Sequence, residues 1–425
     1  MNKIHVHNNS EMVFGIIIVL IISLLISIII EDNAFVLMWC YSISVILIWF
    51  LLKNLKVIGK KNTVFFLLLI MLLILPFQAK YNFLPLSGND RYGFEKHVID
   101  LENQGSNLLL ILFSSKTLYV KIIALFYHYF GHHVMIVYFL SFWSYCLSIL
   151  LVQKSMILLN ISKKFILFGV YYFVFSPIEV VFAMSYLREM PMQLFSILVL
   201  FNCLKYLKTH KIYYLISSVL LTVIASMFHS AMISLIAIII GTIVSNTYKS
   251  KGKKFIDYMI VFALVSVLLS LNAIGLMTEK FGHVSTESLI NGMSYASGNT
   301  TYVNTQVTSV SGFIKQIPYR LLMFSLAPFP WQIRNIGSLI AFVLTSLTQY
   351  FLILHILGLL FKRNGKINKM IIFSIVSLIV LYVICAIGTN NYGTAIRHRV
   401  KMYPVACLVL AYGLNVEKLN GEISS

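Results

Sequence analysis

The stretch VFGIIIVLIISLLISIII, residues 13–30, carries no charged side chain and is long enough to cross a bilayer as one helix. A second run, FVLMWCYSISVILIWFLL at 35–52, follows after a short polar gap. Because no small-residue cleavage site follows the first run, we expect it to stay as a helix rather than be removed as a signal peptide. The opening of the chain therefore predicts a helical hairpin in a membrane.

Similar runs recur along the whole chain, and we count about twelve of the length that a span needs. They lie near 13–30, 35–52, 63–79, 132–152, 165–183, 189–206, 212–228, 230–247, 256–276, 336–361, 370–388 and 400–416. The composition is 59% hydrophobic and only 11% charged, whereas soluble domains are about one quarter charged. The sequence therefore excludes a soluble fold and predicts an all-α, polytopic transmembrane bundle forming a single domain, 1–425.

Lysines follow each even-numbered span, and the positive-inside rule places those ends in the cytoplasm. Both termini are then cytoplasmic. The stretch 107–131 is apolar but carries Lys116 and Lys121, and counting it as a span would invert every later loop. We therefore expect a re-entrant or interfacial helix there, inside an extracytoplasmic loop over 80–131. A second extracytoplasmic loop is expected over 277–335.

The remaining composition limits the cofactors and partners. The net charge of +19 follows from the lysine-rich cytoplasmic loops, so no nucleic-acid partner is expected. The five cysteines lie in apolar runs without a CxxC pair, which predicts apolar packing residues rather than disulfides or a zinc site. No P-loop or GxGxxG motif is present. We expect no cofactor and no metal.

Six of the seven arginines are expected on the outer side, where membrane topology does not call for positive charge. These are Arg91, Arg188, Arg320, Arg334, Arg397 and Arg399. A guanidinium group suits bidentate binding of phosphate or carboxylate. The pattern predicts an anion bound at the outer membrane face. The alternative is pairing with outer acids, which include Asp90, Glu95, Glu189 and Glu287.

Three positions near span ends are the strongest candidates for chemistry. Arg188 opens the span at 189–206, where the helix dipole adds to the attraction for an anion; a salt bridge is the alternative. His229 lies in the outer turn before the span at 230–247 and can act as a general base, or it is a hydrogen-bonded interfacial histidine. Arg397-His398-Arg399 opens the last span and needs either an anion or a network of acids.

Three motifs together resemble the EpsG-like, Wzy-type polysaccharide polymerases. The motifs are Leu187-Arg188-Glu189, Lys205-Tyr206-Leu207-Lys208 and Ala225-Ser226-Met227-Phe228-His229-Ser230. The likeness covers roughly 81–240, with weaker echoes at Pro328-Phe329-Pro330-Trp331 and Arg397-His398-Arg399. The family has Arg-Gln where this chain has Arg188-Glu189, which puts any role of position 189 in doubt.

The resemblance implies an enzyme of the bacterial cytoplasmic (inner) membrane whose active site faces the extracytoplasmic side. Such polymerases join oligosaccharide repeat units carried on undecaprenyl diphosphate into an O-antigen, capsule or exopolysaccharide. The lipid-linked oligosaccharide and membrane lipid are the implied partners, with a chain-length regulator and a flippase as further candidates.

In this reading Arg188, Arg320, Arg397 and Arg399 bind the diphosphate. His229 is the first candidate for the base, with Asp90 and Glu95 as rivals. Aromatic residues that can stack on sugar rings are Tyr92, Tyr295 and Trp331. The alternatives are an O-antigen ligase, which shares the donor, and a lipid-linked oligosaccharide flippase. A flippase calls for charges along a path through the spans, whereas the cations here gather on one face.

Overall fold

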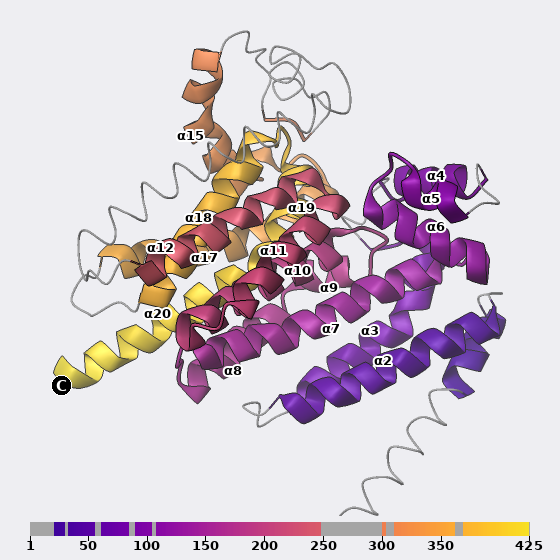
Figure 1. Ribbon diagram of the computed structural model, residues 1–425, viewed down its shortest axis with the longest axis horizontal. Helices are drawn as coiled ribbons and strands as arrows, with labels where there is room; N and C mark the ends of the chain where they lie inside the picture. Colours follow the sequence, from indigo (N-terminus) through magenta and orange to yellow (C-terminus); the bar gives the residue numbers. More distant parts are fainter. Residues whose placement is uncertain are drawn as a thin grey trace, which may run out of the picture. The chain divides into compact units, whose positions relative to one another are not determined.

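The computed structural model describes residues 21–29, 33–55, 61–84, 90–103, 108–247, 300–302, 310–361 and 369–424. These residues form helices joined by short turns (Figure 1). Within the described part of the chain no strand is found, and a single isolated bridge joins Thr301 to Asn391. The predicted all-α class is confirmed.

Five described segments are long and apolar enough to cross a membrane. They are α2 (Ala34–Asn54), α3 (Lys61–Tyr81), α7 (Met135–Leu158), α10 (Glu189–Thr209) and Ile336–His355. A sixth is reached if α8 (Lys163–Val174) and α9 (Pro177–Ala183) form one bent span. The structure therefore agrees with a multi-pass membrane protein. Twelve spans and the sidedness of the termini stay predictions, and the expected span at 256–276 lies outside the described residues.

The chain divides into two compact units, and each is described by itself. Unit 1 comprises residues 1–150 and 180–191. In it α2 packs beside α3, where the Tyr41 hydroxyl donates to the Leu72 carbonyl over 3.0 Å. Helix α4 (Asp90–Asn103) packs on α6 (Leu118–Phe130), which follows the short α5 (Leu108–Phe113). The stretch at 107–131 thus contains two short helices, and its re-entrant or interfacial position stays a prediction.

Unit 2 comprises residues 151–179 and 192–425. Helix α20 (Tyr403–Ser424) packs along α8, and α15 (Val310–Leu326) packs on α18 (Lys369–Ile387) (Figure 1). The remaining elements of the unit are α11 (Tyr213–Phe228), the 3-10 turn η1 (Ser230–Leu235), α12 (Ile236–Thr247), the 3-10 turn η2 (Pro330–Gln332), α16 (Ile336–Ala341), the π-helical turn η3 (Phe342–Ser346), α17 (Leu347–Phe361) and α19 (Tyr392–Val400).

Two helix breaks in unit 2 follow directly from proline chemistry. Proline has no backbone N–H and disfavours a helical conformation in the residue before it. Helix α8 accordingly ends before Pro177, which opens α9, and the chain bends there by 54°. Helix α19 ends at Val400, and α20 restarts at Tyr403 with Pro404 in its first turn. Each break leaves helix-end carbonyls that need a donor from elsewhere.

The contact between α8 and α20 depends on a small residue. A Cβ atom added at Gly169 in α8 would lie 2.8 Å from the Ala411 Cβ in α20 and 2.5 Å from the Met156 Cε. Such distances require the backbones to move apart, because the Ala411 Cβ cannot turn away. Glycine at position 169 therefore sets how closely the two helices approach.

We predict that Gly169→Ala destabilises the protein by about 1–3 kcal/mol through overpacking. Gly358→Ala is the control, because an added Cβ there meets nothing within 4 Å and alanine favours a helix by up to about 1 kcal/mol. Thermal unfolding in detergent should show a lowered Tm for Gly169→Ala and an unchanged or raised Tm for Gly358→Ala. Equal melting of the two variants would contradict the close approach of α8 and α20.

Candidate functional site

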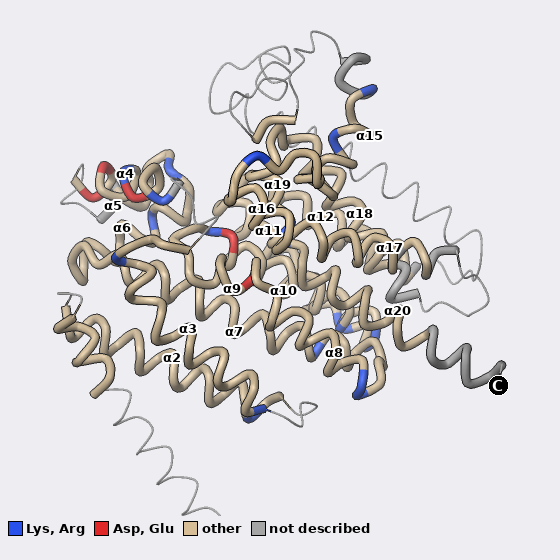
Figure 2. Tube along the Cα trace, turned by 180° about the vertical axis from the view of Figure 1, so that it is seen from behind, with Lys and Arg blue, Asp and Glu red and all other residues tan. Residues whose placement is uncertain are grey.

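In unit 1, helix α4 carries several acidic residues (Figure 2). Glu95 lies between two basic groups. Its Oε2 is 3.5 Å from the Arg91 Nε one turn earlier, and its Oε1 is 3.7 Å from the His132 Nε2 in the turn after α6. His132 was not among the predicted site residues, although a histidine beside a carboxylate is a common acid–base arrangement.

Arg91 is buried, with 9% of its surface exposed. Its Nη1 donates to the Ala79 carbonyl over 2.8 Å, and its guanidinium lies 5.5 Å from the centre of the Tyr138 ring. Ala79 is in the last turn of α3, whose final carbonyls have no partner within the helix. Arg91 therefore caps the C-terminus of α3, where positive charge is also favoured by the helix dipole.

Arg188 lies in a turn whose carbonyls accept hydrogen bonds from two neighbouring side chains. The Ser141 hydroxyl donates to the Ser185 carbonyl over 2.8 Å, and the buried Tyr119 hydroxyl donates to the Tyr186 carbonyl. The half-buried Arg188 guanidinium lies 5.0 Å from the centre of the Phe94 ring in α4, within range of a cation–π contact. This predicted diphosphate ligand is thus in contact with the helix that carries Glu95.

The other predicted residues of unit 1 lie on the same helix. Tyr92 is exposed on α4, with the Arg91 guanidinium 5.8 Å from its ring centre. Asp90 is the first residue of α4, and the structure describes its backbone but not its side chain. The predicted sugar-stacking residue Tyr295 lies outside the described residues.

In unit 2, Arg320 and Arg399 also cap neighbouring helices. The fully buried Arg320 of α15 donates from Nη1 to the Ile387 carbonyl at the end of α18 over 3.0 Å, and to the Asn390 Oδ1 over 2.8 Å. Arg399 of α19 donates to the Ser325 carbonyl over 3.0 Å and to the Ala327 carbonyl over 2.7 Å. Ser325 and Ala327 lie at the C-terminal end of α15. Both arginines were predicted to bind diphosphate, and the structure gives each a second role in helix capping.

Burial of these two guanidinium groups has an electrostatic consequence. It lowers the pKa of Arg399 to about 10 and also lowers the pKa of Arg320, with neighbouring tyrosines acting in the opposite direction. Arg399 remains charged at neutral pH, because its lowered pKa still lies well above 7. Unit 2 therefore holds two buried guanidinium groups, and one of them, Arg399, lies on the same helix as Arg397.

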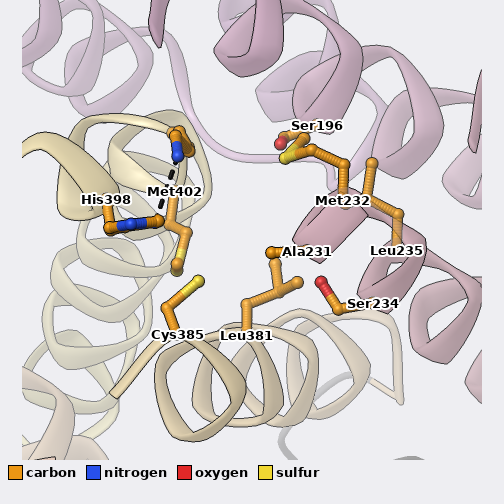
Figure 3. A pocket seen from close by; sticks show the side chains of 10 residues that line it. Ser196, Ala231, Met232, Ser234, Leu235, Leu381, Cys385, His398 and Met402 are labelled. Atoms are coloured by element: carbon orange, nitrogen blue, oxygen red, sulfur yellow. Dashed lines mark hydrogen bonds between the residues drawn. The ribbon is translucent and has the colours of Figure 1, made fainter. Parts of the chain in front are cut away.

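His229 and His398 contact each other in unit 2, and His398 also lines a small pocket (Figure 3). Their ring centres are 5.7 Å apart and the rings are perpendicular. His398 lines the pocket together with Ser196, Cys385 and the buried Lys401, whose Nζ lies 3.0 Å from the His398 Nδ1 (Figure 3). The cavity volume is about 10 Å³, close to the room that one water molecule needs. Arg397, also in the last turn of α19, is half-buried.

A backbone hydrogen bond fixes the tautomer of the His229 imidazole. The Ala231 N–H donates to the His229 Nδ1 over 3.1 Å, so the histidine is the N-cap of η1. A neutral imidazole that accepts at Nδ1 carries its proton on Nε2 and donates from there. A base at Nε2 requires the opposite tautomer and the loss of this cap. His229 thus has a structural role alongside its proposed chemical one.

Trp331 is 77% exposed and stacks on Phe329, with ring centres 4.6 Å apart and planes 7° from parallel. The two rings stand on the Pro-rich turn after α15, where Phe329 also packs against Tyr302 and Met323. An exposed, flat pair of this kind has the geometry of a stacking platform.

One functional candidate was missed from the sequence. Glu179 of α9 is fully buried, and its Oε2 accepts from the Gln193 Nε2 over 2.5 Å. It lies within the predicted span at 165–183, where a carboxyl group is costly and is a functional candidate by default. The feature of the sequence that indicates it is a single acidic residue within an otherwise apolar run.

Comparison with known proteins adds no assignment, since no protein-family profile, curated protein or solved structure matches the chain. Among the described residues no group of three or more His, Cys, Asp or Glu side chains is arranged to hold a metal ion.

We predict that Arg399→Ala lowers thermal stability, because it leaves the Ser325 and Ala327 carbonyls buried without their donor. Each unpaired buried carbonyl costs about 1–3 kcal/mol. Arg399→Lys should retain part of the stability, because an ammonium group lacks the planar fork that reaches both carbonyls. Melting curves in detergent, with the exposed Arg334→Ala as control, test this. Equal Tm values for Arg399→Ala and Arg334→Ala would overturn the capping role.

Proposed function

We propose that the chain is a membrane glycosyltransferase that joins undecaprenyl-diphosphate-linked oligosaccharide repeat units into a surface polysaccharide. It acts in the bacterial cytoplasmic membrane, with its active site facing the extracytoplasmic side. The observation that carries the proposal is the contact between His229 and His398. These residues belong to two separate motifs, Ala225–Ser230 and Arg397–Arg399, through which the chain resembles the Wzy-type polymerases.

The cations of the site have two tasks in this proposal. The half-buried Arg397 contacts the diphosphate directly. Arg188, which belongs to unit 1 and is also half-buried, is a further proposed diphosphate ligand on the strength of its own motif. Arg320 and Arg399 hold the helix ends in place and add positive charge from beneath, where low dielectric strengthens their effect. Preorganised donors of this kind stabilise the charge that develops on a leaving group. No nucleotide is consumed, because the glycosyl-diphosphate bond supplies the free energy.

In the reaction, a hydroxyl oxygen of the lipid-linked acceptor unit attacks the anomeric carbon of the growing chain. The bond from that carbon to the diphosphate oxygen breaks, and undecaprenyl diphosphate leaves with the electron pair. The hydroxyl proton passes to a base, for which His229, Asp90 and Glu95 are the candidates. Glu95 gains support from its position between Arg91 and His132, and His229 must give up its capping bond to serve. Tyr92, Tyr295 and Trp331 remain the proposed sugar-stacking residues.

An O-antigen ligase is the nearest alternative, because it uses the same donor and the same arginines but transfers finished chains to a lipid core. A flippase is the alternative from another class. The buried Glu179 is the observation that favours it, since a carboxyl within a bent span is also found along translocation paths. The gathering of cations in α19 and its surroundings favours a one-sided site.

We predict that cells lacking this gene carry a single repeat unit per lipid, and that the wild-type gene restores a ladder of longer chains on a polysaccharide gel. Arg397→Ala should lower elongation about 100-fold, the usual cost of one donor to a developing charge. Full-length chains that stay on the lipid carrier would instead identify a ligase. An unchanged ladder in the deletion strain would overturn both assignments.

His229 allows its chemical and structural roles to be separated. Asparagine is a strong N-cap, so His229→Asn keeps the start of η1 but removes the imidazole, whereas His229→Ala removes both. We predict that both variants lose chain elongation and that only His229→Ala also melts at a lower temperature. Normal elongation by His229→Asn would show that capping is the role of this residue and would leave Glu95 or Asp90 as the base.

A further inference from the structure

The Val400 carbonyl, at the end of α19, lacks the donor that a continuous helix would supply. In an α-helix this carbonyl accepts from the backbone N–H four residues later. That residue is Pro404, which has no N–H. Val400 is buried, with 1% of its surface exposed, so water cannot easily take the place of the missing donor.

A side chain from α10 supplies this donor. The Gln193 Nε2 donates to the Val400 carbonyl over 2.7 Å, across 207 positions of sequence, and Gln193 is itself fully buried. A buried carbonyl without a donor is costly, so the bond is a strong constraint on where α19 ends. Arg397 and His398 lie in the turn that leads to Val400, and their positions depend on this end.

Glu179 in turn holds the Gln193 amide. Its Oε2 accepts the other N–H of the same Nε2 over 2.5 Å, so one amide group links α9, α10 and the end of α19. The Glu179 Oε1 and the Gln193 Oε1 have no hydrogen-bond partner among the described residues. The Gln193 Nε2 faces two acceptors, the Glu179 carboxylate and the Val400 carbonyl. Rotating the amide by 180° would place the Gln193 Oε1 against both oxygens, so this orientation is fixed.

We propose that Gln193 and Glu179 are positioning residues, which hold the end of α19 and thereby place Arg397 and His398 for chain elongation. The inference rests on the proposed polymerase function. Gln193 makes the decisive bond, and Glu179 orients it. Neither side chain touches the substrate.

This assignment predicts a particular order among four variants. Gln193→Leu removes the donor to Val400 and should lower elongation by about 100-fold, the scale expected of a displacement near 1 Å in an active site. Glu179→Leu leaves that donor in place and should be milder. Glu179→Gln should be nearest to wild type, because its Oε1 still accepts from Gln193. Asn202→Leu, which removes a half-buried amide of the same helix as Gln193, bonded to Ser217 in α11, should elongate normally.

The readouts are the length of the polymer ladder and the labelling of α19. Thr394→Cys is combined with each variant, and the cells are treated with a membrane-impermeant maleimide. The native cysteines are all buried, so the label should report the introduced cysteine in α19. Gln193→Leu should change the labelling rate several-fold, whereas Asn202→Leu should not. Equal membrane levels of the variants ensure that folding is not the cause.

Two results would overturn the positioning role. One is normal elongation and unchanged labelling in Gln193→Leu. The other is a loss in Glu179→Gln as large as in Glu179→Leu, with Gln193→Leu milder, which would assign the carboxyl group a chemical role. Failure of the polymerase proposal looks different, because the deletion strain itself would then keep its ladder, and the labelling rates would still decide whether Gln193 holds α19.

Discussion

Every helix end that is buried away from water must find a hydrogen-bond donor for its last carbonyls within the protein, and the packing of this chain follows from that need. The last carbonyls of every helix lack an internal donor, and an apolar environment offers no water to replace it. In this chain, side chains from neighbouring helices provide the donors. The buried capping side chains are Arg91 on α3, Arg320 on α18, Arg399 on α15 and Gln193 on α19. Each bond fixes one helix end and joins two elements of the same unit.

This arrangement gives the arginines a physical reason to be buried that is independent of any ligand. A guanidinium group meets two carbonyls at once and also interacts favourably with the negative end of a helix dipole. In the proposed function, the same groups also raise the positive potential that attracts the lipid diphosphate. Structural capping and the proposed anion binding would then reinforce each other at α19, where the buried Arg399 follows the half-buried Arg397.

Much of the helical layout was predictable from apolar runs alone. The expected spans at 35–52, 63–79 and 212–228 coincide within two residues at either end with α2, α3 and α11. Composition is informative there because a lipid-facing helix must be apolar along its whole length. The bend between α8 and α9 was not predicted, although Pro177 marks it, because a hydropathy run does not show a change of direction.

The roles of the candidate site residues could be predicted from the sequence less well than the helices. The arginines were read as ligands because their carbonyl partners lie 12 to 74 positions away and carry no side-chain signal. The cap on His229 comes from a backbone N–H two residues later, which no residue type reveals. Glu179 was overlooked within an apolar run, and its bond to Gln193 depends on a bend that was not foreseen. Only the three-dimensional arrangement shows that His229 and His398 approach each other.

The proposed function requires that this chain by itself links lipid-diphosphate repeat units. It is tested by incubating the purified protein in lipid vesicles with one undecaprenyl-diphosphate-linked repeat unit as donor and acceptor. We expect products of two and more repeat units, with one undecaprenyl diphosphate released for each new glycosidic bond. Recovery of the unchanged repeat unit, or transfer that occurs only when a separate lipid core is supplied, would contradict it.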